Sequence, residues 1–295
     1  MRCRFAQIAI VAAVCLLADD PHVQAQDSPC PTHSASASGD KRPSGREISV
    51  AEVTFSGSRQ MPTLEQDEIA ASIKQRTYGN SLDGVTDEAV ETVKAGWQDH
   101  GYFKVRVGGE ERTLTSSPAN WRIALSFHVD EGFQYKLDGI TFKHNKAIRD
   151  VSALRGLFPI NDGDIFSRGK IRKGLQNLSK AYQQIGYIDF TSVPDTTVDD
   201  ENKLISLDID MDEGQQFYVS SVDILGLDEQ ARQKLLKELP IKRGQIYNSR
   251  LWELSLQKYS SMLPGCECRY YEPPRLDEKT GTVALTLGFR PCSND

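Results

Sequence analysis

A strand-like pattern that occurs twice constrains this chain more than any other feature of its sequence. Glu131-Gly132 and Glu213-Gly214 lie 82 residues apart, and the apolar positions after each pair keep that spacing. A unit of about 80 residues is too long for a solenoid repeat and suits a small domain. The pattern therefore predicts tandem domains that meet at the Glu-Gly pairs. The matched apolar residues are Tyr135 with Phe217, Leu137 with Val219, Ile140 with Val222, and Phe142 with Ile224.

The first elements of the middle unit are a strand and a short helix. Residues 134–142 alternate between polar and apolar side chains, as a half-buried strand does, with a register break near Gly139. Asn145 is placed to cap a short helix whose apolar residues recur every third position through 148–154. A turn containing proline and glycine then ends this helix.

A longer helix and two more strands complete the middle unit. Ser167 is placed to cap the helix and Gly186 to end it, and its apolar residues follow one stripe. Strands are predicted at 187–193 and 204–211. The predicted element order is therefore β-α-α-β-β. The stripe consists of Ile171, Leu175, Leu178, Tyr182 and Ile185.

The flanking units show the same order. In the third unit, the segment LPIKRGQIYNS parallels FPINDGDIFSR, which stands 81 residues earlier. In the first unit, Thr63 with Gln66 is typical of a capping box, and Gly101-Tyr102 corresponds to Gly186-Tyr187. Agreement of three units in element order is rarely produced by chance.

Each unit must bury two amphipathic helices and three alternating strands. Packing both helices on one face of a three-stranded sheet meets that need, which predicts an α+β class. The predicted domains are 48–132, 133–214 and 215–292. The other sheet face should be solvated because it carries His128, Asp189, Thr191, Asp208 and Asp210.

The first 25 residues have the pattern of a signal peptide. Arg2 and Arg4 precede a short apolar run at 8–17, and Val23-Gln24-Ala25 offers small residues for cleavage. The run is shorter than the roughly 20 residues that span a bilayer, although an uncleaved anchor stays an alternative. Residues 26–47 are rich in Ser, Ala, Pro, Gly and charge, which indicates a disordered tether.

These units resemble POTRA (polypeptide-transport-associated) domains, which have a β-α-α-β-β fold. The resemblance rests on the Glu-Gly pairs before the first strand and on the Gly-Tyr pairs at 101–102 and 186–187. The Pro/Gly turns of the second and third units add to it, and it covers about 48–290. Such domains occur in arrays on the periplasmic side of outer-membrane assembly and secretion proteins.

Two features depart from the family pattern. Gly265-Cys266 stands near the expected Gly-Tyr pair of the third unit, so its second strand is atypical. The family usually continues into a membrane β-barrel of alternating segments of about ten residues, and no such series follows the third unit. The resemblance therefore implies the periplasmic part of such a protein, at the outer membrane of a Gram-negative-type bacterium.

The resemblance also implies a binding site. In the family the strand after the second helix is a sheet edge that can pair with an extended chain, which recognises backbone rather than particular side chains. In this sequence those edges are 102–107 and 187–193. The alternative is that they are simply edges. The candidate partner-binding residues are Phe103, Val105, Val107, Ile188, Phe190 and Val193.

Composition and motifs argue against other function classes. The net charge is −6 and basic residues are scattered, which argues against nucleic acid as a partner. The sequence contains no GxSxG, HExxH or phosphate-loop motif, and its histidines show no metal-ligand spacing. We therefore expect neither an enzyme nor a cofactor.

The cysteines favour one disulfide. Export leaves Cys30, Cys266, Cys268 and Cys292. A hairpin between the last two strands would bring Cys266 opposite Cys292, with Cys268 one pleat further in. An oxidising compartment favours a Cys266–Cys292 bridge. A Cys-x-Cys metal or redox site is the alternative.

The leading functional hypothesis is an exported array that binds extended polypeptide clients or an outer-membrane β-barrel protein during assembly or secretion. One alternative is a structural adaptor that spaces other cell-envelope proteins. Another is the barrel-less fragment of a split outer-membrane assembly protein.

Overall fold

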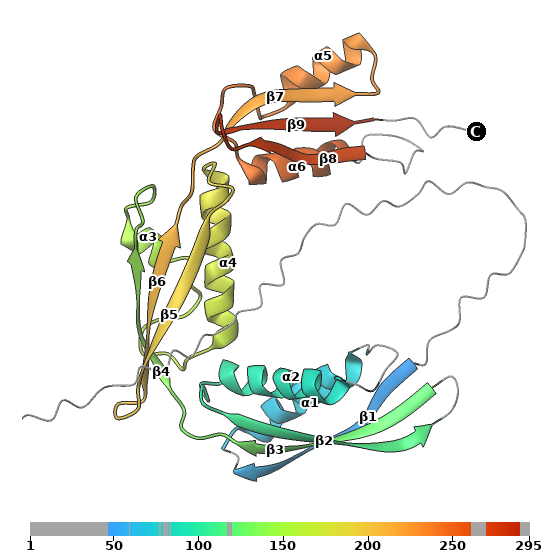
Figure 1. Ribbon diagram of the computed structural model, residues 1–295, viewed down its shortest axis with the longest axis vertical. Helices are drawn as coiled ribbons and strands as arrows, with labels where there is room; N and C mark the ends of the chain where they lie inside the picture. Colours follow the sequence, from blue (N-terminus) through green and yellow to red (C-terminus); the bar gives the residue numbers. More distant parts are fainter. Residues whose placement is uncertain are drawn as a thin grey trace, which may run out of the picture.

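Three small α+β units follow one another in the computed structural model, which describes residues 47–58, 60–76, 78, 82, 84–116, 120–260 and 270–289. Each unit packs two helices against a three-stranded sheet (Figure 1). The predicted α+β class and β-α-α-β-β order are confirmed. The signal peptide and the tether lie outside the described residues, and the ends of the domain ranges 48–132, 133–214 and 215–292 stay predictions.

The first domain contains β1 (Glu47–Ser58), α1 (Thr63–Gln75), α2 (Val85–Asp99), β2 (Arg106–Ser116) and β3 (Asn120–Asp130). The sheet order is β1-β3-β2, in which β3 pairs in parallel with β1 and antiparallel with β2. The predicted capping box is wrong. Helix α1 follows Pro62 without a side-chain cap, because the amide of Gln66 turns back to the carbonyl of Met61 at 2.6 Å.

The second domain contains β4 (Lys136–Lys143), α3 (Val151–Arg155), α4 (Arg168–Gln184), β5 (Thr191–Asp199) and β6 (Leu204–Asp212), in the sheet order β4-β6-β5. Ser167 caps α4 as predicted, since its hydroxyl accepts from the N–H of Lys170 at 3.2 Å. Asn145 does not cap α3. The cap is Asp150, which lies next to the helix and accepts two of its first N–H groups.

The third domain contains β7 (Tyr218–Leu225), α5 (Glu229–Glu238), α6 (Ser249–Ser260), β8 (Tyr270–Asp277) and β9 (Thr282–Gly288), in the sheet order β7-β9-β8. In all three sheets the last strand is therefore central and the two earlier strands are edges. This order follows from the sequence pattern, because the last strand of each unit is the most consistently apolar on its inner face.

The first strand of each domain carries a register shift at the same place. The predicted break near Gly139 is confirmed. A β-bulge bends the strand and re-aims the side chains that follow, so both halves can turn apolar residues toward the helices. The shifts lie between Val50 and Glu52, between Leu137 and Gly139, and between Val219 and Ser221.

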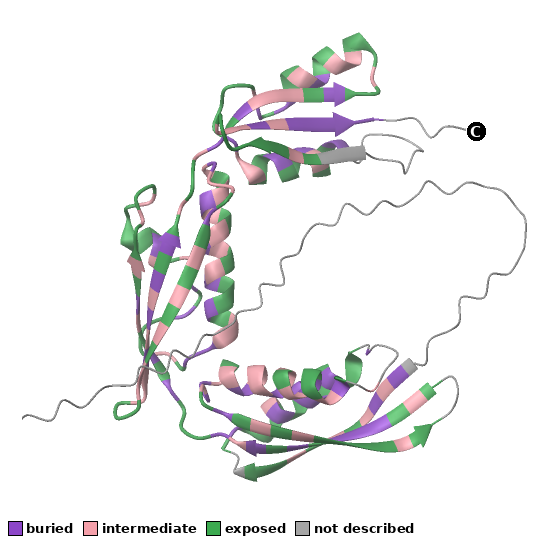
Figure 2. Ribbon diagram, viewed as in Figure 1, coloured by how far each residue is buried: buried purple, intermediate pink, exposed green. Residues whose placement is uncertain are grey.

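Each domain has its own hydrophobic core between the sheet and the helices (Figure 2). Trp97 in the first domain, Tyr182 in the second and Phe217 in the third are fully buried. The opposite face of the sheets is polar, and His128 and Asp210 there are exposed as expected. Three separate cores explain why each unit repeats the whole apolar pattern.

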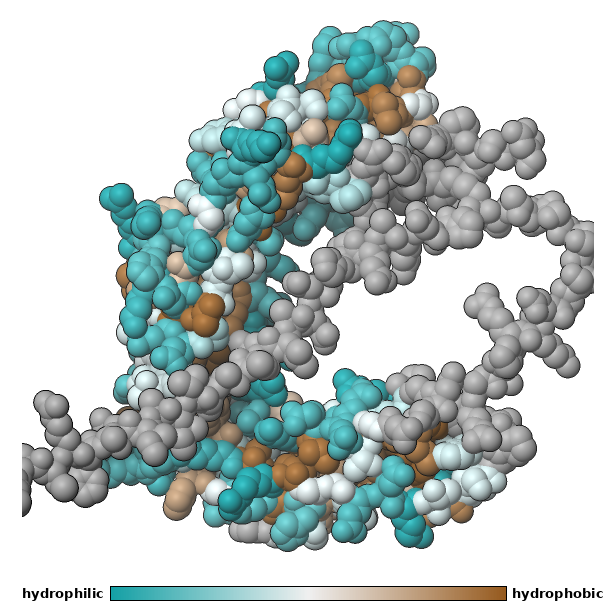
Figure 3. Space-filling model, viewed as in Figure 1, coloured by the Kyte–Doolittle hydropathy of each residue, from teal (hydrophilic) through white to brown (hydrophobic). Residues whose placement is uncertain are grey.

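The three domains form an open arc in which the second helix of each lies on the inner side (Figure 1). Helix α2 contacts α4, and α4 contacts α6. The visible surface is mainly hydrophilic, with hydrophobic side chains in separate patches on all three domains (Figure 3). Among the described helices, none combines the length and the hydropathy that a membrane crossing requires.

Candidate functional site: domain joints and sheet edges

The glutamate of the first Glu-Gly pair is a buried structural acceptor. Glu131 accepts from the indole N–H of Trp97 at 2.8 Å and from the backbone N–H of Met61 at 3.1 Å, and also from that of Gln60. Its carboxylate therefore ties the end of β3 to helix α2 and to the loop after β1. Gly132 follows with φ +69°, a conformation that glycine adopts without steric cost.

The second Glu-Gly pair repeats this arrangement. Glu213 accepts from the hydroxyl of Tyr182 at 3.0 Å and from the backbone N–H of Ala147 at 2.9 Å. Burial, followed by the neighbouring Glu213 carboxylate, raises the pKa of Tyr182 well above its ordinary value. The repeated Glu-Gly motif is thus explained by internal bonds that close the first and second domains.

Each Gly-Tyr pair forms the joint to the next domain. Gly101 has φ +88°, and its carbonyl accepts from the N–H of Tyr135 at 2.8 Å. Gly186 has φ +91°, and its carbonyl accepts from the N–H of Phe217, also at 2.8 Å. A Cβ on either glycine would lie within 3.0 Å of atoms of the following domain. The glycines therefore allow two domains to approach closely.

The first joint also carries a polar cluster that crosses between domains. Lys104, which follows Gly101, places its ammonium 2.6 and 2.7 Å from the two carboxylate oxygens of Asp200 in the β5–β6 loop. The hydroxyl of Tyr135 donates to the same carboxylate at 2.5 Å. We call Lys104, Asp200 and Tyr135 the joint cluster. Its bonds lower the pKa of Asp200, chiefly through Lys104 and then through Tyr135.

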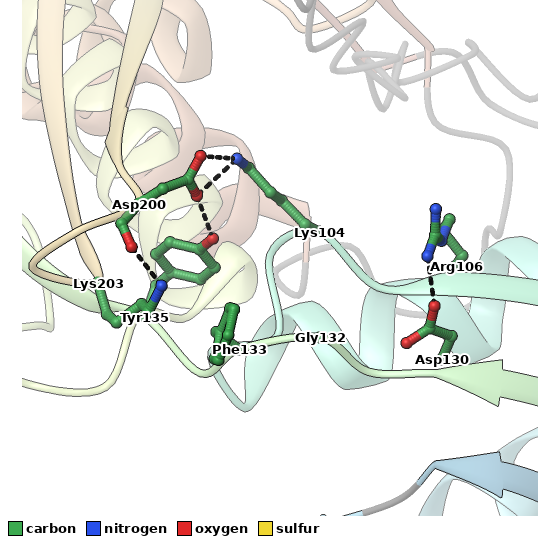
Figure 4. Close-up of a pocket in the computed structure, with 8 residues that line it drawn as sticks. All are labelled: Lys104, Arg106, Asp130, Gly132, Phe133, Tyr135, Asp200 and Lys203. Carbon is green, nitrogen blue, oxygen red and sulfur yellow. Dashed lines mark hydrogen bonds and ion pairs between the residues drawn. The ribbon is translucent and has the colours of Figure 1, made fainter.

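A recess opens beside the joint cluster (Figure 4). Its volume is about 360 Å³. It lies where the start of β2, the end of β3, the linker to β4 and the β5–β6 loop meet, so both domains contribute to it. The lining residues are Lys104, Arg106, Asp130, Gly132, Phe133, Tyr135, Asp200 and Lys203.

The sheet edges differ in how far they are covered. On the β4 side, Gly163 and Phe166 of the loop before α4 donate N–H bonds to carbonyls of β4 and its lead-in at 2.7 and 3.0 Å. The loop before α6 covers β7 in the same way. On the other side, no strand among the described residues pairs with the outer edge of β2, β5 or β8. The edges that follow the second helices are therefore the more open ones.

Two of the six predicted edge residues lie on these strands. Val107 is in β2, half-buried against the core of the first domain, and Val193 is in β5 with 67% of its surface exposed. Val105 and Phe190 are buried in the turns before the strands. The predicted strand segments therefore begin before the strands of the structure, which start at Arg106 and Thr191.

The remaining two residues pack against the following domain. Phe103 contacts the core of the second domain, where its ring meets that of Phe166 edge-on with 5.5 Å between centroids. Ile188 contacts the core of the third domain in the corresponding way. Both side chains are thus part of the joints.

Comparison with known proteins identifies the repeated unit. Residues 135–214 match the family model "POTRA: Surface antigen variable number repeat". These residues form a POTRA domain. Across the whole array, the crystal structure of POTRA domains 3–5 of Haemophilus influenzae BamA covers 86% of this chain with a TM-score of 0.59 and 18% sequence identity. All of that structure is matched, so the three domains together have the fold of a POTRA array.

Two curated relatives are outer membrane protein assembly factors by name. The one from Treponema pallidum is 23% identical over 230 residues, and BamA of Buchnera aphidicola is 21% identical over 218 residues. The matches cover 75% and 68% of this chain. The chain spans only 27% and 34% of the length of these relatives.

The predicted disulfide lies outside the described residues. Cys266 and Cys292 are outside, so the disulfide stays a prediction. In the part of the chain that the structure describes, no cluster of His, Cys, Asp and Glu could hold a metal ion.

Sequence reasoning missed the recess between the first two domains. Phe133 directly follows the first Glu-Gly pair, and its position in the second joint is taken by the polar Gln215. The apolar Phe133, at a position where the second joint has a polar residue, was the sequence signal for this recess. Asp200 and Lys203 gave no signal, because a polar β-hairpin loop looks ordinary in sequence.

Proposed function

We propose that this POTRA array is exported and acts at the periplasmic face of the outer membrane, where it binds extended polypeptides or a membrane-barrel partner during outer-membrane protein assembly. The relatives named as assembly factors support the process, and the fold supports a binding role without catalysis. The observation that carries the proposal is the open outer edge of the strand after each second helix.

Among these edges β2 suits an incoming chain best. An edge strand offers unpaired N–H and C=O groups to an added strand, and a proline there removes a donor. Strand β5 contains Pro194, and β8 contains Pro273 and Pro274. Strand β2 contains no proline over its 11 residues. We therefore place polypeptide binding first on β2.

Two neighbouring prolines test this edge. Successive residues of a strand point their N–H groups to opposite sides, so one of Glu110→Pro and Glu111→Pro removes an outward donor and the other breaks the pairing with β3. The outward variant should keep its urea unfolding midpoint and lose crosslinks between a photoreactive residue at Arg112 and unfolded barrel precursors. Unchanged crosslinking in both variants would contradict edge binding.

Proline at Val105 or Phe190 is a poor test of the edge. Val105 donates its N–H to Tyr102 at 3.1 Å, and Phe190 donates to Tyr187 at 3.4 Å, inside buried turns. Either variant would disrupt the turn, so a loss of binding would reflect local unfolding and not the loss of an edge hydrogen bond.

The prolines of β5 and β8 favour the structural adaptor as the second candidate, because they protect two of the three edges. An adaptor would give crosslinks to a single stoichiometric partner. Crosslinks at Arg112 to many different precursors would support client binding instead.

A further inference from the structure

Helix α4 has the largest net charge of the described helices. It contains five basic residues and no acidic residue, although the whole chain has a net charge of −6. The second helices of the other domains differ from it. Helix α2 contains four acidic residues and one lysine, and α6 contains two basic residues and one acidic residue. The charge of α4 is therefore a property of this domain and not of the repeat.

Four of the five basic side chains are exposed, and no described residue forms an ion pair with them. Arg168 differs, because it is half-buried and donates to the first domain at 3.3 Å. The four exposed cations are thus available to a group outside the molecule, and we call them the basic face. They are Lys170, Arg172, Lys173 and Lys180.

The basic face extends along the side of α4 that points away from the sheet. Lys173 and Lys180 are seven residues apart, so their Cα atoms are separated by about 10.5 Å along the helix axis. Gln176 lies between them, and none of the large apolar side chains of α4 is exposed. The start of the helix is occupied, since the carboxylate of Asp99 accepts the N–H of Gly169 there. The face therefore offers charge and hydrogen bonds but no apolar surface.

We propose that the basic face docks an acidic segment of a partner protein. Ammonium and guanidinium groups bind carboxylates through charge-assisted hydrogen bonds. Carboxylates three residues apart in an extended segment, or seven apart in a helix, match the spacing of Lys173 and Lys180. Each exposed pair contributes little, so the face should mainly speed the encounter with the partner. This site goes beyond the proposed function, because it recognises side-chain charge on a surface apart from the edge of β2.

Two other occupants fit the basic face less well. Helix α4 lies on the inner side of the arc with the first and third domains to either side, so a flat membrane surface would meet those domains first (Figure 1). A second copy could offer the acidic helix α2. Two of its carboxylates are already paired, since Glu88 lies 3.0 Å from Arg76 and Glu91 lies 3.4 Å from Lys94. An acidic segment of another protein is therefore the favoured occupant.

Two labelled peptides test the proposal with the full chain. Both have sixteen residues and capped ends; one carries four Glu, and the other carries Gln at the same positions. Fluorescence anisotropy should show binding of the Glu peptide only, and its affinity should fall as the salt concentration rises. Lys173→Glu with Lys180→Glu should weaken it by about tenfold, because each exposed ion pair accounts for up to about fivefold. A peptide with Lys in place of Glu should bind this variant better than it binds the wild type.

Lys234→Glu with Lys237→Glu is the matched control, because it makes the same charge change at two exposed lysines of α5 in the third domain. It should leave the affinity for the Glu peptide close to that of the wild type. Urea unfolding should show that both variants stay folded, since all four lysines are exposed.

Equal losses of affinity in the two variants, or no binding of the Glu peptide to the wild type, would overturn the proposal. If the Glu peptide does not bind and the α4 variant alone loses binding to anionic vesicles, the occupant is a membrane. If that variant alone loses self-association in sedimentation, the occupant is a second copy. The outward proline variant of β2 should bind the Glu peptide as the wild type does, so the edge and the basic face can fail separately.

Discussion

The two joints of this three-domain array have the same backbone hydrogen bonds. In each, a glycine carbonyl accepts an N–H of the next domain at 2.8 Å. A glutamine of the linker, Gln134 or Gln216, donates its side-chain amide to the carbonyl before that glycine, at 2.9 Å in both joints. The side chains of Ile165 and Ile246 lie against the two glycines. The backbone of the joint is therefore a repeated device.

The side chains around the joints differ in charge. At the first joint, Lys104 and Asp200 have opposite charges and Tyr135 adds a hydroxyl. The corresponding residues of the second joint are Asp189, Glu278 and Phe217. Two acids and a phenylalanine cannot form such a cluster. The second joint instead has Gln215, which donates to the carbonyl of Glu278 at 2.7 Å.

This difference separates two tasks. The shared backbone bonds and the buried glycine contacts hold the domains together, whereas the joint cluster adds an orientation restraint at the first joint only. Exposed ion pairs contribute little to stability, so the restraint should act on the angle between domains more than on their folding. We expect the array to bend more readily between the second and third domains than between the first and second.

The largest effect should come from the joint glycines. In Gly101→Ala, a Cβ would lie 2.7 Å from the side chain of Ile165 and 2.9 Å from the carbonyl of Tyr135, at φ +88°. The left-handed conformation alone costs about 1–2 kcal/mol for alanine, and the clash adds to it. Urea unfolding should show the loss. Gly163→Ala is the control, because Gly163 has φ +86° with no neighbour within 4 Å. Equal losses in both variants would mean that the close approach of the domains is unimportant.

The Glu-Gly carboxylates come next. Glu131→Ala leaves the buried N–H groups of Trp97 and Met61 without their acceptor, which should cost about 3 kcal/mol in urea unfolding. Glu213→Ala should cost less, because Glu213 is only half-buried and water can reach the exposed N–H of Ala147 once the carboxylate is removed. A larger loss of unfolding free energy for Glu213→Ala than for Glu131→Ala would show that the exposure of the glutamate does not determine how much its hydrogen bonds stabilise the domain.

The features that repeat between domains could be predicted from the sequence. Glu-Gly, Gly-Tyr and the apolar alternation recur because the first two domains must each close their sheet and approach the next domain, so these patterns predicted the element order. Pattern reasoning extended the edge strands too far, to Tyr102 and Tyr187. Alternation continues through Phe103 and Ile188, but these side chains serve the core of the following domain, and the chain turns before the strand begins.

The joint cluster could not be predicted from sequence. Lys104 and Asp200 are 96 residues apart, and they meet only because the β5–β6 loop folds back over the joint. Each residue alone reads as an ordinary surface charge. Only the packing of two domains brings such residues together, and single-sequence patterns carry no information on that packing.

Removing the joint cluster should change motion more than stability. Asp200→Asn removes the charge that pairs with Lys104, and ¹⁵N relaxation should then report more independent tumbling of the first domain. Glu278→Gln, at the corresponding position of the second joint, is the control and should change nothing. Unchanged relaxation in Asp200→Asn would remove the proposed restraint.

The same cluster predicts a pH dependence. Burial first, then the hydrogen bond and charge of Asp200, raise the pKa of Tyr135 to about 12. Because the folded pKa exceeds the ordinary value of about 10, the stabilisation is complete below pH 10 and is lost as the pH rises through about 12. Absorbance titration of Asp200→Asn should give a lower pKa for Tyr135 that still exceeds 10, since burial remains. An unchanged pKa would separate Tyr135 from the cluster.

The smallest effect is expected from building the missing cluster into the second joint. Asp189→Lys with Phe217→Tyr places a lysine and a hydroxyl where Lys104 and Tyr135 stand in the first joint, and Glu278 supplies the carboxylate. The third domain should then tumble less independently in ¹⁵N relaxation, and the gain should fade at high salt because the new pair is exposed. Asp189→Asn with Phe217→Tyr is the control, since it removes the like charge without adding an ion pair. If the control restricts the third domain as much as the lysine variant does, repulsion between Asp189 and Glu278 loosens the second joint, rather than the lack of an attractive pair.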